Sequence, residues 1–163
     1  MITENTVSSD EVVIQASVEC VWRVLTDFSR YGEWNTFCPS CESELVLGAA
    51  VNMQVDLGFG LQQQTEYMCR IDPLEAIAWR MANQPGDAIH AVRTQYLKKL
   101  SDSSCSYISI DQFSGESTAQ MMELMAKPAE ITEAQSTTRN ATEALVGIET
   151  EPSDRVNEPW ATR

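Results

Sequence analysis

The sequence predicts a single α+β domain built from a seven-stranded antiparallel sheet and a long C-terminal helix. Three observations predict it. A short strand runs directly into an amphipathic helix near the N-terminus, six β-rich segments follow between short turns, and helical spacing of apolar residues returns towards the C-terminus. At 163 residues, the chain is long enough for one full core and too short for two ordinary domains.

The first elements are a strand at 11–16 and an amphipathic helix. Ser17 is a candidate N-cap for this helix, because a serine hydroxyl can accept a hydrogen bond from an amide one turn later. One face of the helix carries the apolar residues Val18, Val21, Trp22, Leu25 and Phe28. Ser29 can begin a second, shorter helical turn, and Pro39 with Ser40 ends it.

Six β-rich segments complete the predicted sheet. They lie at 42–47, 51–57, 62–71, 76–82, 91–100 and 105–113. The stretches between them are rich in Gly, Pro, Asp and Ser, a composition typical of hairpin loops. Because connections this short join strands that lie side by side, we expect an antiparallel meander.

Helical spacing returns at the C-terminal end. Ser117 followed by Gln120 is a capping-box pattern, and it precedes the methionine-rich start of the last helix. Pro128 interrupts or kinks this helix. Apolar residues then recur at helical spacing to about 148, whereas 150–163 has two prolines, several charges and no periodicity. We expect a domain over 1–149 and a flexible tail over 150–163.

Composition and charge exclude several function classes. With 11 Lys and Arg against 24 Asp and Glu, the formal charge of −13 repels phosphates, so we expect no nucleic-acid partner. No apolar run approaches the roughly 20 residues that span a bilayer, and the start lacks a signal core, so we expect no membrane insertion and a cytoplasmic location. The five cysteines are scattered and odd in number, unlike a disulfide framework.

The opening of the chain carries a family resemblance. The stretch 14–28, IQASVECVWRVLTDF, followed by YGEWN at 31–35, resembles the polyketide cyclase-like branch of the SRPBCC superfamily, which includes START and Bet v 1-like proteins. Leu47-Gly48, Ala78-Trp79-Arg80 and the segment 111–115 also resemble that branch. The resemblance implies a helix-grip fold, with the sheet wrapped around the C-terminal helix and a ligand cavity between them. For some members it implies cyclase or aromatase activity.

Two features depart from that pattern. The segment 36–41 carries Cys38 and Cys41, where similar proteins have no paired cysteines, and Pro128 interrupts the last helix. A Cys-x-x-Cys spacing occurs in zinc and redox sites. Zinc needs two further ligands, and the redox motif should precede a helix, whereas here it enters a strand. We expect no metal site.

Aromatic and methionine side chains are candidates for ligand binding. Tyr31, Trp34 and Phe37 follow the first helix, where similar proteins have the mouth of the cavity. They either bind a flat ligand there or, for Trp34 and Phe37, fill the core. Trp79 points either into the cavity or into a dry core. The same alternatives hold for the methionines of the last helix, which form either a ligand wall or ordinary core: Met121, Met122 and Met125.

Four residues of two neighbouring strands complete the candidate site. Arg93, Gln95, Asp111 and Phe113 share the concave face if the hairpin between their strands keeps them in parity; a one-residue shift would turn them outward. A buried charge needs a partner, so Arg93 and Asp111 form either a structural pair or an anchor for a ligand carbonyl, phenol or carboxylate.

The predicted function is binding of a small hydrophobic or aromatic molecule, lipid or polyketide-like, in the internal cavity. No nucleophile elbow or Gly-rich phosphate loop is present, and we expect no cofactor. One alternative is a polyketide cyclase, aromatase or dehydratase in which Asp111, Arg93 or Tyr31 assists proton transfer. Another is a protein-interaction module whose cavity is filled by side chains. An open sheet edge also permits a homodimer.

Overall fold

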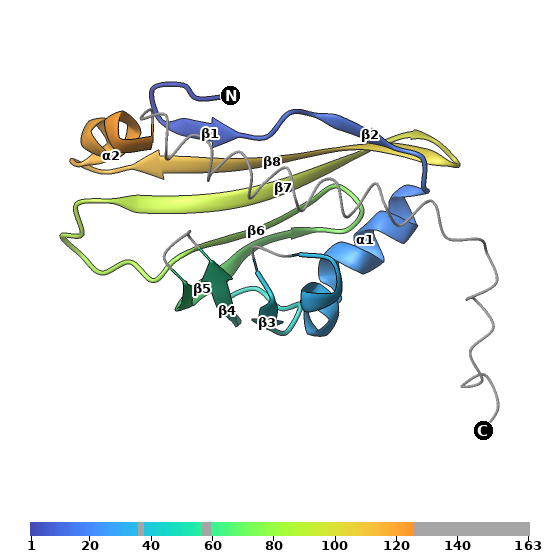
Figure 1. Ribbon diagram of the computed structural model, residues 1–163, viewed down its shortest axis with the longest axis horizontal. Helices are drawn as coiled ribbons and strands as arrows, with labels where there is room; N and C mark the ends of the chain where they lie inside the picture. The colour runs from blue at the N-terminus through green and yellow to red at the C-terminus, as the bar shows by residue number, and fades with distance from the viewer. Residues whose placement is uncertain (36–37, 57–59, 126–163) are drawn as a thin grey trace.

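The computed structural model describes residues 1–35, 38–56 and 60–125. Within these ranges the chain forms one antiparallel sheet, two α-helices and a 3-10 helix (Figure 1). The fold class is therefore α+β, as predicted, with the large antiparallel sheet of a helix-grip fold. The predicted continuation of the last helix beyond 125, the domain boundary at 149 and the tail lie outside the described residues.

The helices are α1 (Val18–Thr26), the 3-10 helix η1 (Phe28–Glu33) and α2 (Thr118–Met125). The strands are β1 (Thr6–Ser8), β2 (Val12–Ile14), β3 (Ser40–Glu42), β4 (Ala50–Asp56), β5 (Leu61–Asp72), β6 (Ala76–Met81), β7 (His90–Ser101) and β8 (Ser104–Ser114). Their order in the sheet is β1-β8-β7-β6-β5-β4-β3, and β2 also pairs with β8. The segments from β3 to β8 thus form the predicted meander. α1 and α2 lie at opposite ends of the sheet (Figure 1).

The N-terminal edge differs from the single strand predicted at 11–16. β1 and β2 both pair with β8, and residues 9–11 between them oppose only residues 108 and 109. Ser9 forms this bulge: its amide donates to the Ser109 carbonyl at 3.0 Å, and its hydroxyl accepts from the Ser109 amide at 3.1 Å. A side-chain oxygen has replaced a backbone acceptor, which interrupts the ladder. Because the residues before 11 are mostly polar, the sequence pattern did not predict β1.

The strand predicted at 42–47 was wrong. β3 ends at Glu42, and residues 43–49 form a loop whose apolar side chains Leu45, Val46 and Leu47 are exposed. This loop turns at Gly48, which has φ +84° and donates its amide to the Met68 carbonyl at 2.7 Å. Alternation of apolar and polar residues does not make a strand when no neighbouring strand pairs with it.

α1 forms as its sequence predicts. The amide of Cys20 donates to the Ser17 hydroxyl at 3.3 Å, which confirms the N-cap. The buried face consists of Val18, Val21, Trp22 and Leu25, and it packs towards β7. None of the helices in the described ranges is long and apolar enough to cross a membrane.

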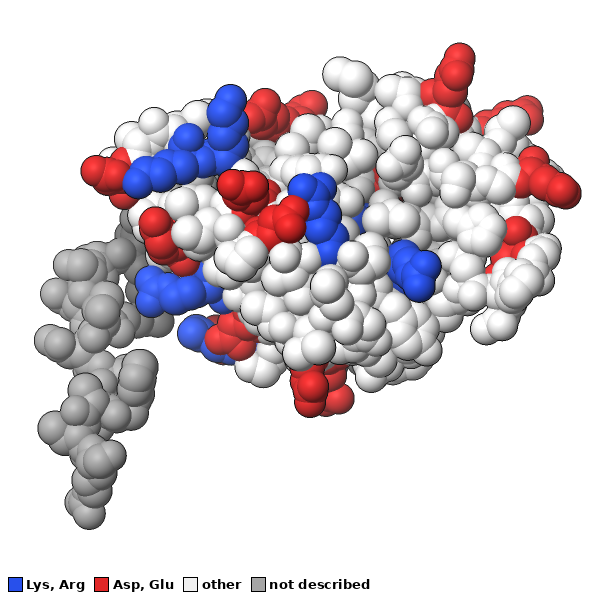
Figure 2. Space-filling view, turned by 180° about the vertical axis from the view of Figure 1, so that it is seen from behind, with Lys and Arg blue, Asp and Glu red and all other residues white. Residues whose placement is uncertain are grey.

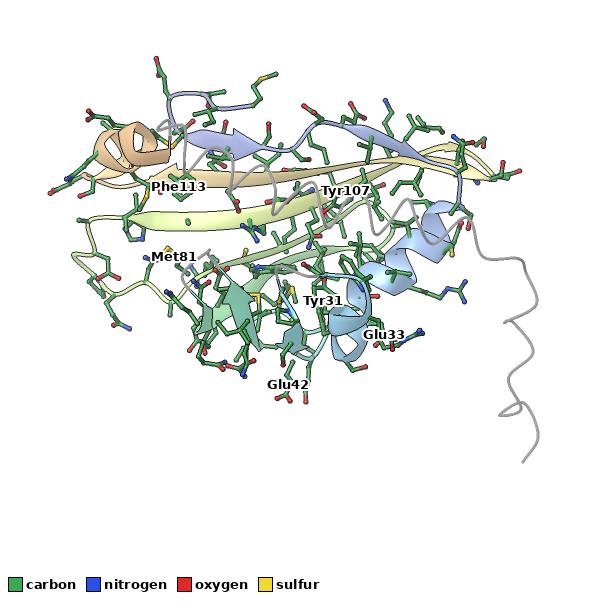
Figure 3. All side chains as sticks on the ribbon, in the orientation of Figure 1. Tyr31, Glu33, Glu42, Met81, Tyr107 and Phe113 are labelled. Atoms are coloured by element: carbon green, nitrogen blue, oxygen red, sulfur yellow. The ribbon has the colours of Figure 1, made fainter. Side chains whose placement is uncertain are left out.

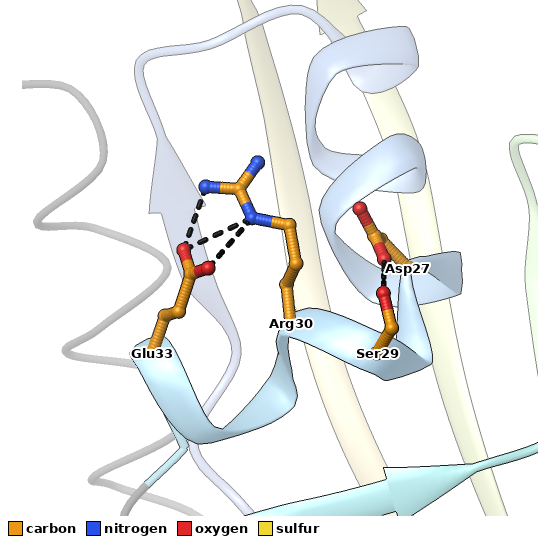
Figure 4. Close-up of polar contacts among 4 residues, drawn as sticks. All are labelled: Asp27, Ser29, Arg30 and Glu33. Atoms are coloured by element: carbon orange, nitrogen blue, oxygen red, sulfur yellow. Dashed lines mark hydrogen bonds and ion pairs between the residues drawn. The ribbon is translucent and has the colours of Figure 1, made fainter.

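Some charged side chains on the surface form ion pairs with residues close in sequence. On η1, Arg30 forms an ion pair of 2.6 Å with Glu33, and Ser29 donates to Asp27 (Figure 4). Both members of the ion pair are exposed, so solvent screens the attraction and it adds little stability. Figure 2 shows acidic and basic side chains scattered over one face of the molecule, with large uncharged areas between them.

A close backbone contact joins η1 to the segment before β3. A Cβ atom at Gly32 would lie 2.4 Å from the Pro39 carbonyl oxygen, so only glycine allows this approach. The contact holds the entry to β3 against η1.

We predict that Gly32→Ala destabilises the protein by roughly 1–3 kcal/mol, because a backbone oxygen cannot move aside without displacing β3. Thermal unfolding followed by circular dichroism measures the loss. The matched control is Ser40→Ala, an exposed position in the same segment, which should leave the midpoint unchanged. Equal midpoints for Gly32→Ala and the wild type would contradict the role of this contact.

Candidate functional site

A pocket of about 400 Å³ lies on the concave face of the sheet, over β4 to β8. Its apolar wall includes Met53, Val55, Met81, Ala91 and Phe113, and its polar groups include Glu66, Arg93 and Asp111. Figure 3 shows Phe113 and Met81 at the end of the sheet nearest α2. An apolar pocket with a few convergent polar groups is the usual form of a small-molecule site.

Arg93 and Asp111 form a bidentate ion pair at the polar side of this pocket. They are direct partners in the β7–β8 register, with Nε–Oδ1 and Nη2–Oδ2 distances of 2.7 and 2.8 Å. Their side chains are 30% and 19% exposed, so the pair still faces the pocket. Burial alone would lower the pKa of Arg93, but the charge and hydrogen bonds of Asp111 outweigh it and raise that pKa. The β7–β8 register meets the condition for a shared face, since Arg93 pairs with Asp111 and Ala91 with Phe113.

Glu66 is a third charged residue of the pocket, and sequence reasoning missed it. It lies on β5 opposite Met81, two strands away from Arg93. Burial raises the pKa of its carboxyl, Arg93 lowers it, and the negative charge of Asp111 raises it further. The net shift is upward, so Glu66 keeps its proton to a higher pH than an ordinary glutamate.

The sequence around Glu66 gave little sign of its position. Ile71 faces the core opposite Ile77, and strict alternation from Ile71 would turn Glu66 outward. The register shifts between Met68 and Arg70, so Cys69 is the extra residue of a bulge. Because a bulge reverses the alternation, Met68 and Glu66 face inward.

Gln95 belongs to a buried chain of polar groups next to the pocket. The Tyr107 hydroxyl donates to Gln95 Oε1 at 2.9 Å. Tyr31 also interacts with Gln95 through its side chain, and its hydroxyl donates to the Leu25 carbonyl at 2.7 Å. Burial raises the pKa of both phenols, so both are neutral. Tyr31 is not among the residues that line the pocket, and its proton is already engaged.

The other predicted aromatic residues lie mainly in the core. Trp79 is buried and meets Phe28 edge-on, with ring centroids 6.4 Å apart. Trp34 packs against Tyr31 at 4.8 Å, and its indole Nε1 is buried with no hydrogen-bond partner in the described part of the chain. An unsatisfied buried donor is unfavourable and offers a contact for a ligand oxygen. Phe37 lies outside the described residues.

The methionines of α2 belong to a small second core. Met122 is buried against Val7 and Phe113, and Met121 is half-buried beside them. Met125 is the last residue of α2, and its side chain lies outside the part of the chain that the structure describes. Through Phe113 this second core adjoins the pocket.

A larger groove of about 660 Å³ lies elsewhere, between α1 and the turn joining β5 to β6. Its charged groups are exposed, and two of them form local ion pairs of 2.6 Å, Arg70 with Asp72 and Lys99 with Asp102. It contains none of the predicted site residues. We therefore take the smaller pocket on the concave face as the candidate site.

Comparison with protein families decides the identity of the domain. The family model described as polyketide cyclase / dehydrase and lipid transport matches residues 6–96, more than half of the chain. The chain belongs to this family. The resemblance of its opening segment to the polyketide cyclase-like branch is thereby confirmed. A comparison with curated protein sequences gives no match.

Several solved structures share the fold of this chain. The Zhui aromatase/cyclase of a Streptomyces species is 17% identical with a TM-score of 0.66, covering 88% of this chain and 92% of its own. A START superfamily protein from Mycobacterium smegmatis is 16% identical with a TM-score of 0.65, covering 88% and 96%. Norcoclaurine synthase from Thalictrum flavum, solved with dopamine and hydroxybenzaldehyde, is 12% identical with a TM-score of 0.62, covering 91% and 88%. At such identities the likeness extends to the fold alone.

The raised pKa of Glu66 predicts a pH-dependent effect of Glu66→Gln. In the unfolded chain a glutamate has a pKa of about 4.3. Because folding raises the pKa of Glu66, its carboxyl favours the folded state fully below that value, and this contribution is lost as the pH rises through the folded pKa.

Glu66→Gln should therefore raise the unfolding midpoint at pH 7, because the folded wild type disfavours the ionised carboxyl, and lose this advantage near pH 4. Chemical denaturation at several pH values measures the difference. Exposed Gln63 on the same strand supplies the control Gln63→Ala, which should show no pH-dependent difference. An advantage of Glu66→Gln that grows as the pH falls would contradict the assignment.

Proposed function

We propose that the protein binds a small hydrophobic or aromatic molecule, lipid or polyketide-like, in the pocket on the concave face of the sheet. The observation that carries the proposal is the bidentate Arg93–Asp111 pair beside an apolar wall of Met53, Met81 and Phe113. The apolar wall buries the body of the ligand, and the ion pair anchors one polar end. The volume of about 400 Å³ suits a molecule of a few fused rings or a short folded chain.

The charges of the pocket narrow the class of ligand. Asp111 already neutralises Arg93, and an ionised Glu66 adds a negative charge. A fatty-acid carboxylate would therefore meet repulsion, whereas a ketone or phenol could hydrogen-bond to the guanidinium or the carboxyl groups. We infer a neutral ligand with carbonyl or hydroxyl groups. The open pocket supports this function over the filled-cavity interaction module.

Binding of a neutral hydroxylated polycyclic aromatic probe should exceed binding of palmitate by at least about tenfold, the ratio that 1.4 kcal/mol gives. Quenching of tryptophan fluorescence measures both affinities, and native mass spectrometry of the purified protein identifies any molecule that co-purifies. Ala91→Phe fills the pocket and should abolish binding of the aromatic probe.

The size-matched control is Gln112→Phe, at an exposed position on β8, which should bind like the wild type. Equal binding by Ala91→Phe and the wild type would show that the probe does not enter this pocket. Tighter binding of palmitate would contradict the inferred ligand class.

A second candidate function is that of a cyclase, aromatase or dehydratase, and the position of Glu66 favours it. A carboxyl whose pKa is raised holds its proton to a higher pH, and in its protonated form it can act as a general acid on a bound ketone. Its raised pKa and open access make Glu66, with Arg93 and Asp111, a better candidate than Tyr31.

If the pocket is catalytic, Glu66→Gln should keep the affinity for the aromatic probe and lower product formation from a poly-β-ketone thioester by about 100-fold or more. Single-turnover assays with product analysis by mass spectrometry measure this loss, and Gln63→Ala serves as the control. Equal turnover in Glu66→Gln and the wild type would exclude Glu66 as the acid. Absence of any turnover in the wild type would leave the binding function alone.

The cytoplasmic location, the homodimer and the domain limits stay predictions.

A further inference from the structure

Two buried cysteines and a buried methionine lie near one another beside the pocket. Cys38 and Cys41 are each 3% exposed, on either side of the entry to β3. Cys41 is the direct register partner of Met53 on β4, which is 5% exposed. Residues directly opposite each other in an antiparallel pair have Cβ atoms roughly 4.5–5.5 Å apart on one face. Cys38 interacts with Cys41 through its side chain. We call these two cysteines, together with the facing Met53, the sulfur cluster.

Contacts with the backbone hold this sulfur cluster in place. The Cys38 amide donates to Asn35 Oδ1 at 3.0 Å, and the Cys38 thiol donates to the Ser40 carbonyl at 3.3 Å. The contact between Gly32 and Pro39 fixes the same segment against η1. Since the chain positions both thiols before any ligand arrives, binding would require little ordering of the loop.

The electrostatic surroundings distinguish the two thiols. A hydrogen bond between them lowers the pKa of Cys38 despite its burial, and the positive charge of Arg93 lowers it further. The same hydrogen bond, together with burial, raises the pKa of Cys41. The negative charge of Glu66 opposes Arg93 at Cys38, so the contact between the two thiols is the main interaction of the pair.

The ligand set does not fit zinc. Zinc sites use three or four Cys, His or carboxylate ligands, and no group of three such residues that could hold a metal occurs among residues 1–35, 38–56 and 60–125. Sulfur-only sets of thiolate and thioether select soft monovalent ions, above all Cu(I), which is satisfied by two or three sulfur ligands.

We propose that Cys38, Cys41 and Met53 form a binding site for Cu(I). The ion enters already reduced. Two Cu–S bonds form as two thiol protons leave, and the bis-thiolate complex carries one net negative charge. The Met53 thioether supplies a third, weaker ligand. The site does not rest on the proposed function of the pocket, because none of its bonds involves the pocket ligand.

Competition with a chromophoric Cu(I) chelator under anaerobic, reducing conditions tests the site on the full chain. The wild type should withdraw one Cu(I) per chain from the chelator. Cys38→Ser and Cys41→Ser should each weaken binding by more than about 100-fold, the upper range for loss of an outer-shell partner, and Met53→Leu by about 10-fold. Affinity should also fall as the pH is lowered, because protons compete for the thiolates.

Cys69→Ser is the matched control, since Cys69 is an exposed thiol on β5, and it should bind Cu(I) like the wild type. The proposal is overturned if the wild type leaves Cu(I) with the chelator, or if Cys69→Ser loses as much affinity as Cys38→Ser. Because a serine in the core can impair folding, X-ray absorption of the Cu(I)-loaded wild type provides a second test. A first shell of sulfur alone is expected, and nitrogen or oxygen ligands would refute the site.

Discussion

The pairing of β7 with β8 is the constraint on which the pocket depends. Arg93 faces Asp111, Gln95 faces Ser109 and Leu97 faces Tyr107 along the concave side. Near the hairpin the register shifts between Lys99 and Ser101, so the strand contains one extra residue before the turn. That residue decides the parity of every pair that follows. Without it, Arg93 would pair with Gln112, and the guanidinium and the carboxylate would lie on opposite faces of the sheet.

The pocket combines apolar walls with charges that nearly cancel. The ion pair satisfies Arg93, and burial keeps Glu66 and the phenols of Tyr31 and Tyr107 in or towards their neutral forms. Such an interior can accept a neutral molecule without leaving a charge unpaired. It offers hydrogen-bond donors and acceptors without a dominant electrostatic field. The family and the fold are compatible with both carriage and catalysis, so the distinction rests on these side chains.

The paired cysteines Cys38 and Cys41, which depart from the family pattern, lie in an ordered part of the core. Both cysteines are buried, and the backbone around them is held by Asn35 and by the glycine contact. The sulfur cluster adjoins the pocket through Met53, which belongs to both. Occupation of one could therefore influence the other through this shared side chain.

Local patterns in the sequence determined the element order, the N-cap at Ser17, the buried face of α1 and most strands of the meander, because these depend on neighbouring residues. The resemblance of 14–35 also predicted the family. The facing of Arg93 and Asp111 was conditional on parity, which only the tertiary structure decided. Bulges at Ser9, Cys69 and before Ser101 reset the alternation. Tertiary structure alone brought Glu66 into the pocket and set Cys41 opposite Met53, since strand pairing joins residues that no local pattern connects.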